Sequence, residues 1–349
     1  MVTATAREAL RKVMNPPNPW HRTMVEDLGP PPTAALEIFE DRSRSALSRN
    51  QSPDVGFEFS VNPYRGCHHG CAYCYARPTH EHLDFGAGTD FERKLVVKRD
   101  VAELLRAAFD KPTWRGDVVV FSGNTDCYQP LEASLGLTRA CLQVCLAYRN
   151  PVGIITKSAL VERDVDVLAE LAEVAHCTVA VSLCFDDAEL ARAVEPGAPS
   201  PARRYKVIER LAKAGVPVGL MCAPIIPGLN DTELPAVLTN ARDAGAAWVG
   251  TTMLRLPGSV AEVFEHRIRT AFPLKAERIL KQIRECRGGK LTDSRFDNRM
   301  KGQGERWQIV QDLVSGLESR LGYGRPPEPP SPSPFRRPGA AGAVQLALL

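Results

Sequence analysis

Three closely spaced cysteines are the strongest chemical signal in the sequence. Cys67, Cys71 and Cys74 follow the pattern C-x3-C-x2-C, and Gly66 and Gly70 interrupt the same segment. Three thiolates on one short loop can converge on a soft metal centre. The spacing alone leaves open a disulfide pair with one odd thiol, a zinc knuckle, and coincidence among the ten cysteines of the chain.

A zinc knuckle would need a fourth ligand, which His68, His69, His80 or His82 could supply. A disulfide would suit a secreted protein, but the N-terminal segment MVTATAREALRKVMNPPNPW lacks the apolar core of a signal peptide. No apolar run approaches the roughly 18 residues of a membrane span. We therefore expect a cytoplasmic protein with no membrane contact.

The charge of the chain is nearly balanced. It has 349 residues, with 44 Lys and Arg against 41 Asp and Glu, which gives a formal net charge of +3. This balance argues against a protein that grips nucleic acid mainly by bulk charge. Arg295, Arg299 and Lys301 could contact phosphates, but acidic residues lie among them, so nucleic acid is only a possible partner.

Proline is concentrated at the two ends of the chain. Six of the 28 prolines fall in the first 32 residues, and seven more follow Gly324. Such stretches do not build a packed core. We therefore expect a loosely structured arm over residues 1–50 and a disordered, proline-rich tail over residues 324–349.

Between these ends, apolar runs of strand length alternate with segments of helical period. The runs cover residues 56–62, 116–123, 152–158, 178–185, 216–225 and 246–256. Helices are expected after Asp100, Ser200 and Asp231, which can begin or cap them. A strand about every 30 residues, apolar on both faces, predicts a parallel (β/α) sheet. Periodicity does not decide between a barrel and an open sheet, but either places chemistry at the carboxyl ends of the strands.

The cysteine segment, in which Tyr73 directly precedes the third cysteine, resembles the signature of the radical S-adenosylmethionine (SAM) enzymes. Its wider context, NPYRGC-x3-C-x-YC-x-ARPTH, is similar to the branch related to spore photoproduct lyase. Further matches follow in order over residues 56–310: GNTDCYQPLE (123–132), ITKSALVERDVDVL (155–168), PIIPGLND (224–231) and RMKGQG (299–304).

The resemblance implies the fold and the cofactors. The expected fold is a partial (β/α)6 TIM-type barrel over residues 56–260, with a C-terminal helical extension over residues 261–322. Cys67, Cys71 and Cys74 would hold a [4Fe–4S] cluster, whose fourth iron binds SAM through its amino and carboxylate groups. A flavodoxin- or ferredoxin-like reductant would supply the electron that cleaves SAM. The resulting 5′-deoxyadenosyl radical would abstract a hydrogen atom from a substrate that the sequence does not identify, in a lyase or oxidoreductase reaction.

The same resemblance places SAM contacts at successive strand ends. The segment SGNTD replaces the usual GGE-type triplet that meets the SAM amino group. Lys157 and Ser158 end the next strand, where a lysine can pair with the SAM carboxylate, and Ser182 is a candidate for a ribose hydroxyl. Ile225 to Gly228 corresponds to the segment beside adenine, whereas Asn230 and Asp231 are expected in a turn and a helix cap. The predicted cofactor-binding residues are Tyr73, Ser122, Gly123, Asn124, Thr125, Asp126, Lys157, Ser158, Ser182, Ile225, Pro227 and Gly228.

Of the other cysteines, only Cys127 lies at a strand end that faces the expected site. Its thiol could relay a hydrogen atom or could simply pack in the core. In spore photoproduct lyase the hydrogen-donor cysteine aligns nearer Gly123 than Cys127, which argues against a DNA photoproduct lyase. That repair activity and a non-catalytic zinc or Fe–S module for nucleic acid remain the alternatives. The six expected core thiols are Cys141, Cys145, Cys177, Cys184, Cys222 and Cys286.

Overall fold

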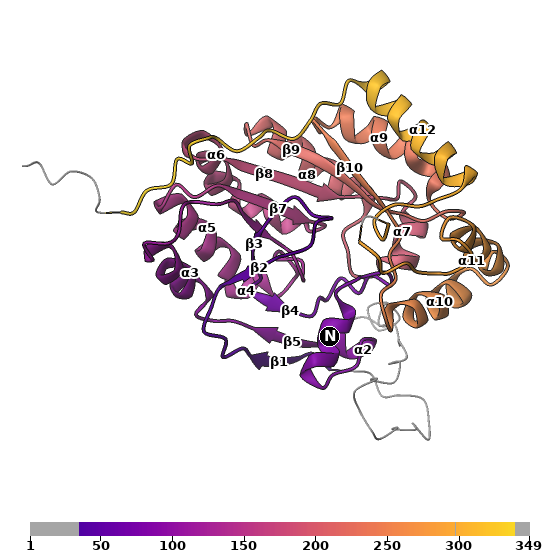
Figure 1. Cartoon of the computed structure of the whole chain (residues 1–349), viewed down its shortest axis with the longest axis horizontal. Coiled ribbons are helices and arrows are strands. Elements are labelled where there is room, and N and C mark those ends of the chain that lie inside the picture. The colour runs from indigo at the N-terminus through magenta and orange to yellow at the C-terminus, as the bar shows by residue number, and fades with distance from the viewer. Residues whose placement is uncertain (1–34, 297, 339–349) are drawn as a thin grey trace, which may run out of the picture.

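The computed structural model describes residues 35–296 and 298–338, and its centre is a seven-stranded sheet in the order β10-β9-β8-β7-β6-β3-β2 (Figure 1). All six apolar runs form parallel strands, and β2 (Leu47–Arg49) pairs antiparallel with β3 at one edge. Because β2 and β10 are both edge strands, the sheet does not close, as the partial barrel predicts. The parallel strands are β3 (Phe59–Val61), β6 (Val119–Phe121), β7 (Val152–Thr156), β8 (Cys177–Ser182), β9 (Val218–Ile225) and β10 (Val249–Met253).

Helices connect the parallel strands and bury their apolar faces against the sheet. Ser200 caps one of them through the amide of Arg203, as predicted. Asp100 precedes another but makes no capping hydrogen bond with its side chain, so that predicted cap is wrong. Asp231 begins the short helix η3 (Asp231–Glu233), which leads into the expected helix. The connecting helices are α3 (Val101–Asp110), α4 (Glu132–Leu135), α5 (Leu137–Ala147), η2 (Ala159–Asp164), α6 (Val165–Val174), α7 (Ala188–Val194), α8 (Pro201–Lys213) and α9 (Leu234–Asp243).

A second, three-stranded sheet holds the segment around the cysteines, and the apolar runs did not predict it. Its order is β1-β5-β4, where β1 is Glu37–Glu40, β5 is Lys94–Val97 and β4 is Tyr64–Arg65. Strand β4 leads directly into the cysteine loop, and η1 (Arg77–Leu83) and α2 (Thr89–Arg93) return the chain to β5. Strands β1 and β2 both lie within residues 35–50, so this part of the predicted loose arm is ordered by strand pairing. Residues 1–34 lie outside the described residues.

The C-terminal extension contains α10 (Val260–Ala271), α11 (Ala276–Glu285) and α12 (Glu305–Leu321). Trp307, Val310 and Val314 of α12 belong to the main hydrophobic core, so this extension packs against the barrel domain. No helix in the described part of the chain is long and apolar enough to cross a membrane.

The proline-rich segment differs from the expectation of disorder between residues 324 and 338. Beyond α12 it runs back across the molecule to α3 (Figure 1). There the Phe335 ring lies 5.9 Å from the ring of Phe109 and 6.0 Å from that of Tyr148. The Arg337 side chain donates to the Phe109 and Lys111 carbonyls. A few aromatic and arginine contacts therefore hold a segment that has no regular structure. Residues 339–349 lie outside the described residues.

Replacing Phe335 with alanine should reduce the free energy of unfolding by about 1 to 2 kcal/mol, because a half-buried ring leaves an aromatic cluster. The midpoint of urea unfolding measures this loss. Arg336→Ala is the matched control, since that side chain is exposed. Equal midpoints for both variants would contradict a packed role for this segment.

Candidate metal and cofactor site

The three predicted cluster cysteines lie together on the loop after β4. All three are free, Cys67 and Cys71 are buried, and Cys74 is partly exposed. Burial raises the pKa of Cys71 to about 12, although the neighbouring Lys157 opposes this shift. Burial also raises the pKa of Cys67, and the charges of Cys71 and Cys74 add to this shift. Thiols of this kind become thiolates when a positive centre binds them, which is the chemistry of a metal site.

A fully buried arginine holds the backbone of this loop. Arg77 donates to the Cys71 carbonyl from Nε (3.0 Å) and from one terminal nitrogen (2.8 Å), and to the Gly70 carbonyl (3.1 Å). Its other terminal nitrogen donates to the carbonyls of Ala87 (2.9 Å) and Gly88 (3.0 Å). An ion pair of 2.6 Å with Glu92 balances the charge. One side chain thus joins the cysteine loop to the segment that returns to β5.

Two glycines let other chain segments approach this loop closely. Gly66 has φ +78°, and a Cβ there would lie 2.9 Å from both the His80 ring and the Phe91 carbonyl oxygen. A Cβ on Gly197 would lie 2.4 Å from the His68 carbonyl oxygen, and the Gly197 amide donates to the His69 carbonyl. The segment after α7 therefore supports the loop from the side of β8.

The motif DCYQPLE, after β6, grips the same loop from the sheet. Gln129 accepts from the His68 amide (3.2 Å) and donates to the Gly66 carbonyl (3.1 Å). The Asp126 carboxylate lies 3.4 Å from Nδ1 of His69. The Tyr64 hydroxyl, just before the loop, donates to the buried Glu132. These three residues of the motif each contact the cysteine loop or the strand that leads into it.

A buried polar network extends from this motif to the segment after β7. Glu132 pairs with Arg163 (2.6 Å), and Arg163 also pairs with the fully buried Asp164 (2.8 Å). The Tyr128 hydroxyl donates to the same Asp164 (3.1 Å). The resemblance singled out both motifs, and the structure joins them through these side chains.

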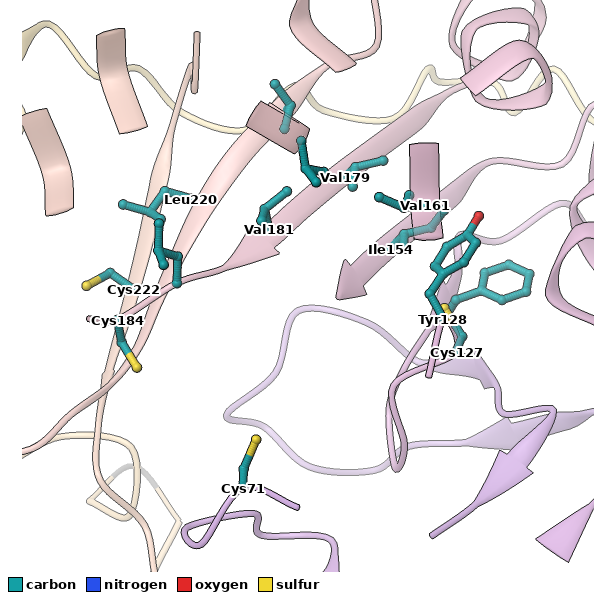
Figure 2. Close-up of a cluster of buried hydrophobic side chains, with 14 of the residues drawn as sticks. Cys71, Cys127, Tyr128, Ile154, Val161, Val179, Val181, Cys184, Leu220 and Cys222 are labelled. Carbon is teal, nitrogen blue, oxygen red and sulfur yellow. The ribbon is translucent and has the colours of Figure 1, made fainter. Parts of the chain in front are cut away.

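A second buried network lies beneath the cysteine loop on the side of β8. The Tyr73 hydroxyl donates to Glu195 and lies 3.8 Å from the Cys184 sulfur. Glu195 also pairs with Arg204, and both are almost completely buried. Arg204 and Lys157 hold the pKa of Glu195 below its ordinary value, although burial acts in the opposite direction. Figure 2 shows the Cys71 and Cys184 sulfur atoms directed toward the same space.

Lys157 is a cation of this network that has no ion pair or hydrogen bond through its ammonium group among the described residues. The group lies 5.6 Å from the centre of the Tyr73 ring. Burial would lower the pKa of Lys157, but Cys71 and Glu195 raise it overall. Lys157 and Arg204 thus face one carboxylate, so the network has an excess positive charge beside Cys71. Thiolates and a ligand carboxylate are groups that would balance it.

The SGNTD segment places strained backbone and an unsatisfied hydroxyl at the end of β6. Ser122 has φ +79°, a conformation that costs energy for a residue other than glycine and is concentrated at functional sites. Its hydroxyl accepts from the Cys127 amide (2.9 Å). The Thr125 hydroxyl is buried and has no hydrogen-bond partner in the described part of the chain, which leaves it available to a ligand. Asn124 is exposed, and its amide donates to the Asn62 side chain (2.8 Å).

The Asp126 carboxylate, in contrast, accepts several hydrogen bonds from other residues of the protein. It accepts from the Thr156 hydroxyl (2.7 Å) and from the amides of Lys157 (2.8 Å) and Tyr128 (2.9 Å). It ties the ends of β6 and β7 to the cysteine loop. We therefore assign Asp126 a positioning role, beside its predicted contact with the SAM amino group.

The remaining predicted contacts lie at the ends of β7, β8 and β9. The Ser158 hydroxyl caps η2 by accepting from the Leu160 amide (3.2 Å), so this hydroxyl already has a hydrogen-bond partner within the chain. Ser182 is buried, and its carbonyl accepts from Arg204 (3.0 Å). Gly228 has φ +80°, and a Cβ there would lie 2.2 Å from the Gln282 oxygen. Ile225 and Pro227 are buried beside it. Asn230 holds this turn through the Ile226 amide (2.6 Å), as the turn prediction requires.

Cys127 lies in the hydrophobic core, with 1% of its surface exposed, and is drawn next to Tyr128 in Figure 2. Burial raises the pKa of its thiol. A relay of hydrogen atoms through Cys127 stays a prediction. The six other cysteines outside the loop are buried, as expected of core thiols, and Cys184 additionally contacts Tyr73.

The zinc knuckle gains no support from the geometry. Within residues 35–296 and 298–338, no three His, Cys, Asp or Glu side chains converge closely enough to hold a single metal ion. The nearby histidines have other contacts, since His69 faces Asp126 and Nε2 of His80 lies 2.8 Å from the Lys94 carbonyl oxygen. A [4Fe–4S] cluster distributes its thiolates over separate iron atoms, so it needs no such convergence.

Comparison with protein families decides the cofactors. Residues 61–241 match the family model described as the radical SAM superfamily. The chain belongs to the radical SAM superfamily. Its cofactors are therefore a [4Fe–4S] cluster and SAM. The residues fit these groups, because three free thiols lie on one loop beside excess positive charge and an unsatisfied Thr125 hydroxyl.

The chain is also similar to curated relatives and to solved structures. An uncharacterised protein of Mycobacterium tuberculosis is 38% identical over 255 residues, which cover 72% of this chain and 74% of that protein. One of Methanocaldococcus jannaschii is 28% identical over 198 residues, or 57% of this chain and 71% of its own length. Spore photoproduct lyase with bound AdoMet and dinucleoside spore photoproduct has a TM-score of 0.56 at 13% identity, covering 82% of this chain and 79% of its own. This last likeness shows a shared fold.

Several residues that support the radical SAM site were not predicted. Arg77 lies inside the matched motif, but nothing in its spacing indicates that its side chain turns back onto the loop. Glu92, Glu195 and Arg204 reach the site from distant segments, and charged residues in amphipathic patterns read as exposed. Gln129 lies in the motif GNTDCYQPLE that carries the family resemblance, and this position was the signal that could have indicated its role.

Replacing Arg77 with methionine should destabilise the protein by about 3 to 5 kcal/mol, because the buried Glu92 loses its ion pair with Arg77 and the loop carbonyls lose their donors. Thermal unfolding and the iron bound per chain after reconstitution measure the effect. Arg93→Gln is the control, a neighbouring arginine with no ion pair among the described residues. The double variant Arg77→Met, Glu92→Gln should recover part of the stability but not the iron content. Full iron binding by Arg77→Met would contradict the positioning role.

Asp126→Asn should reduce the free energy of unfolding of the cluster-free protein by about 2 kcal/mol at pH 7. The His69 interaction and three hydrogen bonds lower the pKa of Asp126 from 3.8 to about 2 against the effect of burial. A lowered pKa gives stability that is present above the unfolded value and is lost as pH falls toward 2. The difference from the wild type should therefore narrow below about pH 4. Urea unfolding at pH 7, 4 and 3 tests this, with the exposed Asp117→Asn as control.

Proposed function

We propose that the protein uses its cluster and SAM to abstract a hydrogen atom from a bound substrate, in a lyase or oxidoreductase reaction. Cys67, Cys71 and Cys74 are the proposed cluster ligands. The observation that carries this proposal is the set of three free thiols on a loop that Arg77, Gln129 and Gly197 hold in place. A thiol set fixed before metal binding reduces the ordering needed when the cluster forms.

When bound, the cluster and SAM would supply one-electron reductive cleavage of SAM, which is the source of the 5′-deoxyadenosyl radical proposed to abstract the hydrogen atom. A flavodoxin- or ferredoxin-like protein is the proposed source of that electron. Lys157 is proposed to bind the SAM carboxylate, because its ammonium group lacks a hydrogen-bonded partner in the described chain. The Thr125 hydroxyl and the SGNTD backbone are proposed to bind the amino group.

The ends of β8 and β9 are proposed to hold the nucleoside part of SAM. Ser182 is buried at the end of β8, where its hydroxyl can meet the ribose. Ile225, Pro227 and Gly228 form a tight apolar turn beside the proposed adenine. Buried apolar groups around these contacts exclude water, which protects a radical from unwanted hydrogen donors.

DNA photoproduct repair is a narrower alternative, suggested by the structural likeness to spore photoproduct lyase. That likeness is at 13% identity and concerns the fold alone. Gly123 stands near the aligned position of that enzyme's hydrogen-donor cysteine, and Cys127 is buried in the core. We therefore favour hydrogen abstraction from a different substrate.

Replacing Cys67, Cys71 and Cys74 together with alanine should abolish iron and sulfide binding and reduce SAM cleavage at least 100-fold, because no thiolate of the proposed set remains. Formation of 5′-deoxyadenosine by the anaerobically reconstituted protein with dithionite measures the cleavage. Cys145→Ala is the matched control, since it removes a buried core thiol. Equal 5′-deoxyadenosine formation by the triple variant and the control would refute the assignment of the ligands.

A further inference from the structure

Arg255, just beyond β10, is a half-buried cation without a partner. Its guanidinium carbon lies 5.8 Å from the centre of the Tyr75 ring. Its side chain makes no ion pair and no hydrogen bond with any residue in the described ranges 35–296 and 298–338. Half-buried arginines are ordinarily paired, because their five donors lose water on burial. The described residues therefore leave the Arg255 guanidinium available to an anionic ligand.

The surroundings of Arg255 are positively charged. Burial, followed by the charge of Arg299, lowers the pKa of Arg255, whereas Tyr75 and Asp54 oppose this shift. Asp54 is the nearby carboxylate that acts on Arg255, and it is already paired with Arg299. The Ser52 hydroxyl also binds Arg299. No carboxylate of the described chain is thus left over to neutralise Arg255.

A cationic cavity lies in the neighbouring C-terminal segment. It has a volume of about 370 Å³, and Arg287, Lys290, Arg295 and Asp293 supply its charged lining. Arg287 donates to the carbonyls of Leu254, Arg299 and Lys301, so it joins the RMKGQG loop to the end of β10. Burial lowers the pKa of Arg287, and the charge of Arg255 adds to this shift, so the two guanidinium groups lie close enough to interact.

The unpaired group lies beside the proposed site of chemistry. Tyr75 follows the cluster cysteine Cys74 directly, and 49% of its side chain is exposed. Its hydroxyl donates to the Gly123 carbonyl (2.7 Å), in the segment at the end of β6. Arg255 therefore meets the exterior where the cysteine loop, β6 and β10 come together. A molecule that approaches the site from this side would pass the guanidinium.

We propose that Arg255 binds an oxyanion, a phosphate or carboxylate group, of a small-molecule substrate beside Tyr75. The proposal rests on the proposed function and adds a substrate class to it. A planar guanidinium pairs with either oxyanion through two parallel hydrogen bonds, which fixes orientation as well as position. A polynucleotide is a poorer fit, because the net charge is only +3 and Arg299, beside Arg255, is bound to Asp54.

The test measures oxyanion binding directly on the reconstituted protein with SAM bound. Inorganic phosphate, acetate and a ten-nucleotide single-stranded DNA are titrated by calorimetry at constant ionic strength. The variants are Arg255→Gln and Arg255→Lys, and the control is Arg278→Gln, an exposed arginine of α11. Cluster content and the dissociation constant of SAM are measured on every variant, so that misfolding and loss of SAM are recognised separately.

We expect the wild type to bind phosphate or acetate, and the tighter of the two identifies the substrate group. Arg255→Gln should weaken that binding about tenfold or more, Arg255→Lys should weaken it less, and Arg278→Gln should leave it within twofold. SAM affinity should stay unchanged in Arg255→Gln.

Three results would overturn the proposal. The first is that Arg255→Gln and the wild type bind the oxyanion equally, or that neither binds it. The second is that Arg255→Gln loses affinity for SAM. The third is that DNA binds at least 100-fold more tightly than phosphate and that this DNA binding depends on Arg255. If instead oxyanion binding depends on Arg255 but the wild type cleaves no SAM, the proposed function fails while the anion site stands.

Discussion

The site depends on the position of the Arg77 guanidinium. The loop that carries the three proposed cluster ligands has no helix or strand ladder to satisfy its carbonyl groups, and buried carbonyls without donors are costly. Arg77 supplies donors to Gly70 and Cys71 on one side and to Ala87 and Gly88 on the other. The ion pair with Glu92 makes the burial of this cation tolerable, because it balances the charge.

Some residues of the family motifs support the cysteine loop, and others are proposed to bind the cofactors. Gln129 and Asp126 follow β6, and both contact the cysteine loop, so they fix the position of the thiols relative to the sheet. Thr125, just before Asp126, has a buried hydroxyl without a hydrogen-bond partner among the described residues. Neighbouring residues at the end of one strand thus have different roles. A side chain whose hydrogen bonds are complete within the chain supports the site, and one that lacks a partner is left for a ligand.

The sequence predicted what depends on local pattern. The six parallel strands follow from apolar runs about one βα unit apart, and the short spacing of Cys67, Cys71 and Cys74 places these three thiols on one loop. The small sheet escaped prediction because β4 has two residues and pairs with β5 across the whole cysteine segment. The buried ion pair of Glu195, just after α7, with Arg204 of α8 escaped it because it follows from tertiary packing, which overrides the local sequence pattern. Residues 35–50 and 333–337 are ordered by contacts with distant strands and rings, which composition alone does not reveal.

Charge balance connects the interior of the site with its exterior. Beneath the loop, Lys157 and Arg204 face the single carboxylate of Glu195, and at the end of β10 Arg255 has no carboxylate of its own. Elsewhere the chain compensates its buried charges, as the Arg77 pair and the Glu132, Arg163 and Asp164 network illustrate. Among the described residues, Lys157 and Arg255 are thus cations without a hydrogen-bonded carboxylate, and they lie near the positions proposed for a cofactor carboxylate and a substrate. A low net charge for the whole molecule is compatible with such a cationic site, because the excess charge is local.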